Sequence, residues 1–201
     1  MREETIKIYK FSELSEESKE RARQWWKEGL NTSNSSNIVI DDAKVVGKLM
    51  GFEISKVYYS GFWSQGDGAC FEGNFRSSEF EPGGVQKYAP KDAELHRIAN
   101  GIEVIVNKFY SVALKVRHSG RYYHENSTQF EVSIMDKEEN EIDTKEAAEA
   151  EKELIKLSRD FMKWIYRSLE ADYEYQNSDE VVDENIESNG YEFTEDGTVW
   201  I

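Results

Sequence analysis

Alternating apolar side chains in the middle of the chain require a sheet with one buried face. Apolar residues occupy every second position from 110 to 116 and again from 130 to 134. Alternation of this kind is typical of strands, and two such runs close together predict an antiparallel hairpin. Because an apolar face is unfavourable in water, helices from other parts of the chain have to cover it.

The turn sets the register of this hairpin. A two-residue turn pairs Val116 with Tyr123 and would put the two apolar runs on opposite faces. A three-residue turn, Ser119 to Arg121, pairs Val116 with His124 and brings both runs to one face. We therefore expect the three-residue turn.

The remaining elements follow from local patterns. The glycine-rich segment 61–73, preceded by an alternating strand over 54–60, predicts a second hairpin, because glycine adopts the positive φ angles that reverse a chain. Apolar residues at helical spacing predict a helix over 92–108 and a longer one from 143 to about 172. Shorter patterns predict a strand over 5–11, helices over 15–29 and 41–50, and a loop over 31–37.

Together these elements predict an α+β fold. We expect a single domain, residues 1–172, with a mainly antiparallel sheet, two hairpins and helices packed on one side. Residues 173–201 form an acidic C-terminal segment. Within it, alternation and an Asp196-Gly197 turn predict a small terminal hairpin.

The acidity of the chain is concentrated at its C-terminal end. The 201 residues include 40 acidic and 25 basic side chains, a net charge of −15. Residues 1–135 are nearly neutral, with 19 acidic and 18 basic side chains, whereas residues 136–201 hold 21 and 7. A one-signed segment repels nucleic acid and anionic membranes, because two polyanions gain nothing by releasing counterions to each other.

Three roles remain open for this acidic segment. It can keep the protein soluble as a solvated face, mimic nucleic acid in a basic groove, or lie against another basic protein surface. The residues expected to contact a basic partner are Asp172, Glu174, Asp179, Glu180, Asp183 and Glu184.

Composition excludes several classes of protein. The chain is 38% hydrophobic and 13% aromatic, which suffices for a core and excludes disorder throughout. A single cysteine, Cys70, excludes a disulfide framework and a thiolate metal cluster. No stretch approaches about eighteen uninterrupted apolar residues, and the first residues have no apolar signal region. We therefore expect a soluble, cytoplasmic protein with no membrane partner.

Two turns hold the candidate binding residues. The tip of the glycine-rich hairpin places an aromatic ring beside polar groups with adaptable hydrogen bonds, at Trp63, Ser64, Gln65 and Asp67. The turn of the central hairpin holds a compact basic and aromatic cluster that would suit an anionic ligand or the acidic C-terminal segment of the chain itself, with candidate residues Arg117, His118, Arg121, Tyr122 and His124. The glycines match neither nucleotide-binding spacing, so no phosphate loop is expected.

Enzymatic chemistry has one candidate nucleophile. Cys70 would need His118 or His124 as base and a carboxylate such as Asp67 to orient the imidazole. No spacing enforces that arrangement, and a lone cysteine in an apolar strand is typical of inert packing. The expected turn puts the two histidines about 7–8 Å apart, but a metal ion needs a third ligand. We expect no catalysis, no cofactor and no metal site.

Four long blocks of sequence, 60–73 (SGFWSQGDGACFEG), 118–125, 161–170 and 191–197, are specific enough to compare. They resemble a family of small acidic proteins encoded by bacteriophages and prophages, many of them called hypothetical and some labelled "antitoxin of toxin–antitoxin stability system". Members of that family are usually richer in Asp, Tyr and Trp where this chain has residues 31–37. The resemblance provides no catalytic residue.

The resemblance implies a protein that acts on host machinery in the host cytoplasm during infection. With no catalytic signature, we expect a non-enzymatic inhibitor or antidote that binds and occludes a host toxin, nuclease or anti-phage defence protein with a basic surface. Two alternatives stay open: a binder, or sponge, of a small anionic signalling nucleotide, and a hydrolase that uses Cys70 with a histidine.

Overall fold

The computed structural model describes residues 5–29 and 33–200, which fall into two compact units. Unit 1 draws on two stretches, Met1–Ser36 and Ala171–Ile201, and unit 2 is Asn37–Glu170. This division differs from the expected 1–172 domain and 173–201 segment. The N-terminal residues belong with the C-terminal ones because apolar side chains of both stretches share one core, separate from the core of unit 2.

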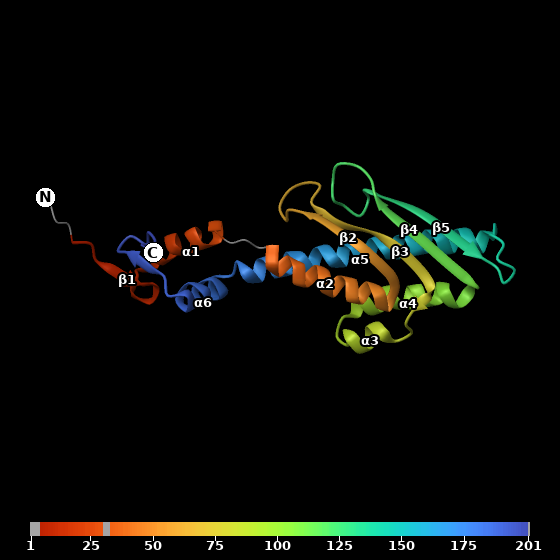
Figure 1. Cartoon of the computed structure of the whole chain (residues 1–201), viewed down its shortest axis with the longest axis horizontal. Helices are drawn as coiled ribbons and strands as arrows, with labels where there is room; N and C mark the ends of the chain where they lie inside the picture. Colours follow the sequence, from red (N-terminus) through yellow and green to blue (C-terminus); the bar gives the residue numbers. More distant parts are fainter. Residues whose placement is uncertain (1–4, 30–32, 201) are drawn as a thin grey trace. The chain divides into compact units, whose positions relative to one another are not determined.

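Unit 2 is built on a four-stranded antiparallel sheet in the order β2-β3-β4-β5 (Figure 1). The strands are β2 (Met50–Ser60), β3 (Gly68–Phe80), β4 (Ser111–His118) and β5 (Thr128–Met135). The mainly antiparallel sheet and both predicted hairpins are confirmed. The first reverses at 61–67, where Gly61 and Gly66 have positive φ angles.

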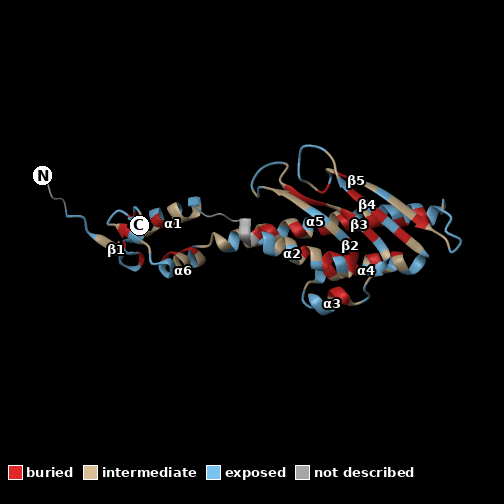
Figure 2. Ribbon diagram, in the orientation of Figure 1, coloured by how far each residue is buried: buried red, intermediate tan, exposed pale blue. Residues whose placement is uncertain are grey.

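The predicted register of the second hairpin is wrong. Val116 pairs with Phe130, not with His124, and residues 119–127 form the connecting loop. This longer loop is closed by its own hydrogen bond from Ser119 N to Ser127 O, at 2.8 Å. The observed and expected registers differ by an even number of residues, so the two apolar runs still share one face. Figure 2 shows the resulting alternation of buried and exposed residues along the strands.

Helices pack on the apolar face of the sheet, as predicted (Figure 1). They are α2 (Ser33–Leu49), α4 (Ala93–Lys108) and α5 (Lys145–Gln176), and a short α3 (Gly84–Tyr88) precedes α4. Asp92 caps α4 by accepting bonds from Glu94 N and Leu95 N, and Trp164 Nε1 of α5 donates to the same carboxylate at 2.8 Å. Phe161 of α5 is fully buried against Phe52 and Phe71 of the sheet.

Helix α2 is longer than expected. Residues 33–37, expected to be part of a loop, are helical, while residues 31 and 32 lie outside the described residues. The helix extends N-terminally because Val39 and Ile40 pack against the core before Asp41, the expected start. These contacts explain the helix back to Val39; residues 33–37 are all Ser or Asn and add no apolar side chain to it.

Unit 1 combines the two ends of the described chain. Its elements are β1 (Ile8–Lys10), a 3-10 turn η1 (Phe11–Glu13), α1 (Glu16–Gly29), α6 (Asp179–Asn189) and β6 (Glu192–Thr194). Strands β1 and β6 pair antiparallel. After β6 the chain reverses at Gly197 and Phe193 bridges to Val199. The small core consists of Phe11, Leu14, Ala22, Val182, Ile186 and Phe193.

Candidate functional site

Two loops of unit 2 contact each other at one end of the sheet. They are residues 61–67, between β2 and β3, and residues 119–127, between β4 and β5, and we call them together the loop face. A methyl group added to Gly66 would lie 3.3 Å from Cδ1 of Tyr122, and one added to Gly68 would lie 3.0 Å from the carbonyl oxygen of Tyr123. The two loops therefore pack without room for larger side chains, which fixes each against the other.

The first loop is held by one carboxylate. Asp67 Oδ2 accepts hydrogen bonds from the backbone N–H of Trp63, at 3.0 Å, and of Ser64, at 2.6 Å. The backbone N–H of Asp67 in turn donates to Ser64 O at 3.1 Å. Trp63 nevertheless remains 73% exposed. Asp67 thus has a structural role, because its hydrogen bonds fix the backbone that carries the indole of Trp63. Ser64 and Gln65, the next residues of the loop, are also exposed.

The second loop is held by stacked rings. Tyr123 stacks on Tyr58 of β2 with ring centroids 5.3 Å apart, and His118 lies 4.9 Å from the same ring. His118 Nε2 is 3.1 Å from the carbonyl oxygen of Tyr122. The ring of Tyr122 itself is 57% exposed. The loop therefore presents a second exposed aromatic side chain on the loop face.

The cations of the loop face do not converge on one point. Arg117 pairs with Glu131 of β5 at 3.3 Å, and His124 Nδ1 lies 2.9 Å from Glu125 Oε2. Arg121 is exposed and, among the described residues, has no hydrogen bond or ion pair. A small anion would need several of these groups at once, so the geometry does not favour the nucleotide-binding alternative.

Cys70 lies near His124, whose backbone hydrogen-bonds to the thiol, while Nδ1 of the imidazole lies 2.9 Å from Glu125 Oε2. His118 ends β4 opposite Thr128 and His124 lies in the loop, so they are not the cross-strand neighbours that the expected turn implied. Burial raises the pKa of the Cys70 thiol to about 11, and the side chain is fully buried. At neutral pH the thiol is therefore protonated and closed to substrates. In the described part of the chain no cluster of three metal-binding side chains occurs.

The acidic C-terminal residues divide between two sides of α6. On the side facing α1, Asp183 accepts two bonds from Arg23, at 2.7 and 2.8 Å, and Asp179 pairs with Lys27 at 2.8 Å. These contacts raise the pKa of Arg23 and lower that of Asp179, in each case chiefly through the side-chain hydrogen bond. Two of the six expected partner-binding acids are thus used inside unit 1.

The adjoining face of α6 carries an acidic stripe, Glu180, Glu184 and Glu187. All three are exposed, and within residues 5–29 and 33–200 none has a side-chain hydrogen bond or ion pair. Their spacing of four and three residues places them on one helix face. Asp172 and Glu174 lie in the last turns of α5. Sequence reasoning missed Glu187, although its spacing from Glu180 and Glu184 would have indicated it.

The fold is α+β, and the loop face at one end of its four-stranded sheet presents two loops with exposed aromatic side chains. Residues 36–179 match the model of a family described as a domain of unknown function (DUF8835), and the chain belongs to this family. The match spans unit 2 and ends where α6 begins, so it leaves out most of unit 1. Neither the curated proteins nor the solved structures contain a match. None of the described helices is both long and apolar enough to span a membrane.

Proposed function

We propose that this protein acts by binding another protein, as a phage- or prophage-encoded inhibitor or antidote that occludes a host toxin, nuclease or defence protein in the host cytoplasm. The loop face supports this proposal. It exposes Trp63 and Tyr122 on two loops whose backbones are fixed by Asp67 and by mutual packing. Exposed aromatic residues on rigid loops are typical of surfaces that bind a partner.

The composition of the loop face suits a protein partner. Trp, Tyr and Arg are the residue types that contribute most binding energy at protein interfaces, and Trp63, Tyr122 and Arg121 are all exposed there. Little conformational entropy is lost when such side chains bind, because the loops are already ordered in their packed conformation.

The acidic stripe indicates the charge of the partner. Glu180, Glu184 and Glu187 are exposed and pair with no cation among the described residues, in a chain of net charge −15. A one-signed surface of this kind accelerates encounter with a basic protein and suppresses encounter with nucleic acid. The basic surface of a toxin or nuclease would meet this requirement.

A quantitative affinity purification from the host tests the loop face. The variant Trp63→Ala with Tyr122→Ala is compared with the wild type and with a matched control, Tyr110→Ala with Tyr175→Ala, which removes two rings that are 62% and 64% exposed elsewhere. We expect a protein retained by the wild type and the control to lose affinity about 100-fold or more for the loop variant. Equal retention by both variants would contradict the proposal.

A second comparison tests the acidic stripe. Changing Glu180, Glu184 and Glu187 to Gln alters the net charge by three, and so does changing Glu146, Glu149 and Glu151, three exposed acids of α5. We expect the stripe variant alone to slow association with the captured protein and to flatten its dependence on salt. If both triple variants behave alike, the stripe is only part of the overall charge.

A further inference from the structure

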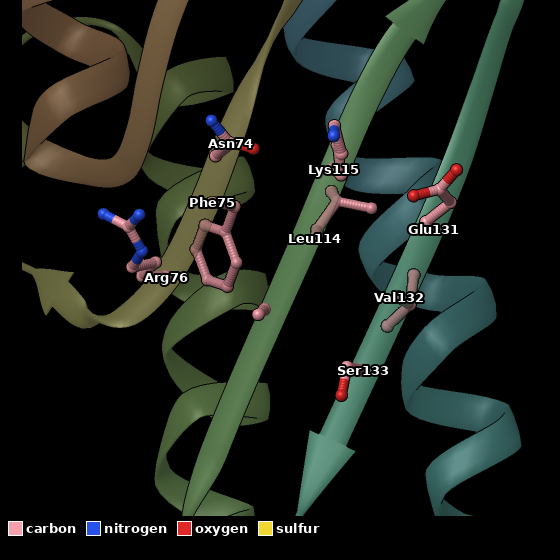
Figure 3. A pocket seen from close by; sticks show the side chains of 9 residues that line it. Asn74, Phe75, Arg76, Leu114, Lys115, Glu131, Val132 and Ser133 are labelled. Carbon is pink, nitrogen blue, oxygen red and sulfur yellow. The ribbon is translucent and has the colours of Figure 1, made fainter.

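Strand β5 is at the edge of the sheet of unit 2. In Figure 3 it carries the labelled Val132 and has β4 on one side, with α5 behind the two strands. Alternate residues of an antiparallel strand direct their backbone groups to the same side. Ile134 O accepts a hydrogen bond from Ile142 N, at 2.9 Å, on the side away from β4. Phe130 and Val132 are in phase with Ile134, so their N–H and C=O groups face outward too, and no described residue pairs with them.

The chain itself begins a further strand on this edge. Residues 140–142 turn back along β5, with an antiparallel bridge from Met135 to Glu141. The chain then leaves the edge and enters α5. The edge thus accepts an antiparallel strand at one end, and the unpaired groups of Phe130 and Val132 continue the same ladder.

The side chains along this edge are apolar and incompletely covered. Phe130 and Val132 lie opposite Val116 and Leu114 of β4. The two β4 residues are buried, whereas Phe130 and Val132 are only half-buried. A strand edge that combines unpaired backbone groups with half-exposed apolar side chains is the kind of surface to which an extended segment adds as a further strand.

A cation without a partner lies at the Phe130 end of the edge. The guanidinium of Arg159, on α5, is 5.2 Å from the centroid of the Phe130 ring. Its Nε is buried with no hydrogen-bond partner, and Arg159 forms no ion pair with any described residue. Lys163, one turn further along α5, lies 3.7 Å from Glu125 and is 51% exposed. This end of the edge therefore favours a carboxylate from outside.

The other end of the edge is acidic. A hollow of about 90 Å³ lies between β5 and the start of α5, with Val132, Ile134 and Ala147 among its lining residues. Glu141 and Asp143 also line it; both are exposed, and within residues 5–29 and 33–200 neither forms an ion pair. The hollow suits a lysine, whose aliphatic stem can cover apolar side chains while its ammonium stays beside the carboxylates.

We propose that the outer edge of β5 binds an extended segment of a partner protein as an added antiparallel strand, with a lysine opposite Val132 and an acidic residue two positions later, opposite Phe130. Side chains two positions apart in a strand lie on the same face, about 7 Å apart, so the lysine meets the hollow and the carboxylate meets Arg159. The order of the two charges fixes the direction of the added strand. The proposal does not depend on the protein that the loop face binds.

A second copy of this chain fits the edge less well. Antiparallel pairing of two β5 strands about Glu131 sets the two Glu131 side chains against each other, which is unfavourable. The same register requires Thr128 of the copy beside Ile134, a place that Ile142 already occupies. A segment of another protein avoids both conflicts, because it carries no acid at the first position and can leave the edge before Ile142.

The test uses the full chain, labelled with ¹⁵N, and seven-residue peptides with blocked ends, and it follows the backbone amides by NMR. The first peptide is Thr-Thr-Lys-Thr-Glu-Thr-Thr, and the second exchanges its Lys and Glu; both are neutral, so the net charge of −15 does not distinguish them. Two further forms of the first peptide carry an N-methyl group, either on the backbone nitrogen of the lysine, which would face β5, or on that of the central threonine, which would face away.

The protein variants are Arg159→Gln and a matched control, Arg167→Gln, which removes an arginine of the same helix that pairs with Glu94. We expect the first peptide to shift the amides of Phe130 and Val132 in the wild type. It should bind the wild type and the control at least about fivefold more tightly than it binds Arg159→Gln, and more tightly than the charge-exchanged peptide binds. Methylation of the lysine nitrogen should weaken binding about tenfold or more, whereas methylation of the threonine nitrogen should not.

Any of four results would overturn the proposal. The amides of Phe130 and Val132 stay unchanged, both arginine variants lose affinity equally, or the peptides of either pair bind with equal affinity. The fourth is a dimer of the chain that the first peptide dissociates, which would assign the edge to a second copy.

Discussion

Substitution of Arg23 tests whether the acidic C-terminal residues are part of a folded unit. The guanidinium donates two hydrogen bonds to Asp183, and the two side chains are only 13% and 31% exposed. Hydrogen bonds to charged groups contribute about 1.5–3 kcal/mol when they are shielded from water. We expect Arg23→Ala to destabilise unit 1 by about 2 kcal/mol, which raises its open population about 30-fold.

Arg21 provides the control on the same helix. It pairs with Asp196, but these side chains are 58% and 57% exposed, so water screens the interaction. We expect Arg21→Ala to leave the stability of unit 1 close to that of the wild type. Asp183→Ala and the double variant with Arg23→Ala complete a cycle in which the two losses are not additive, because both remove the same bonds.

Hydrogen exchange of the full chain, followed by mass spectrometry, measures the effect locally. Amides of α1 and α6 report on unit 1, and those of α4 report on unit 2. Exchange in α1 and α6 should accelerate with Arg23→Ala while α4 stays unchanged. The reasoning fails if Arg21→Ala has the same effect as Arg23→Ala, or if α4 loses protection to the same extent.

Three further predictions concern other parts of the chain. Gly73→Ala should lower the melting temperature far more than Gly29→Ala, since the new methyl group would lie 2.2 Å from a backbone carbonyl oxygen of β2, whereas Gly29 has open space. The buried thiol of Cys70, with its pKa near 11, should resist iodoacetamide at pH 8 in the native protein and react once urea is added; fast native alkylation would contradict its burial. The hydrogen bond from Lys27 lowers the pKa of Asp179 in the folded protein. The stability that this pair contributes is therefore present above about pH 4 and is lost as the pH falls through the lowered pKa of Asp179. The stability difference between wild type and Lys27→Ala, measured by exchange in α6, should therefore shrink as the pH is lowered from neutral to values below about 4.

Local patterns of apolar residues, each contained in a single helix or strand, were sufficient to predict most elements of unit 2. The spacing of Leu95 to Ile105 and of Leu154 to Leu169 defines the helices α4 and α5, because an amphipathic stripe depends only on neighbours along the helix. Alternation likewise fixed which face of β4 and β5 is buried. It did not fix the register, which depends on the hydrogen bond that closes the loop and on the stacking of Tyr123 with Tyr58.

Contacts between distant segments were not visible in the sequence. Arg23 and Asp183 are 160 residues apart, so counting charges by region assigned the acidic residues to solvent, to a partner or to the turn of the central hairpin, and not to α1. The contact between the two loops of the loop face had only an indirect signal, the glycine at position 66, which leaves room for the ring of Tyr122. Side-chain types at the loop tips were identifiable, whereas their juxtaposition required the fold.

The shared core of unit 1 cannot form until the chain has been synthesised past Phe193. Phe11 and Ala22 leave the ribosome well before Val182 and Phe193, which cover them. At 5–20 residues per second, the 160 residues between Arg23 and Asp183 take roughly 8 to 32 s to synthesise. During that interval the N-terminal helix has no partner, and its apolar side chains are accessible to chaperones and proteases. A ribosome that stalls before residue 182 would leave unit 1 without half of its core, so degradation of such fragments would begin at the N-terminal end.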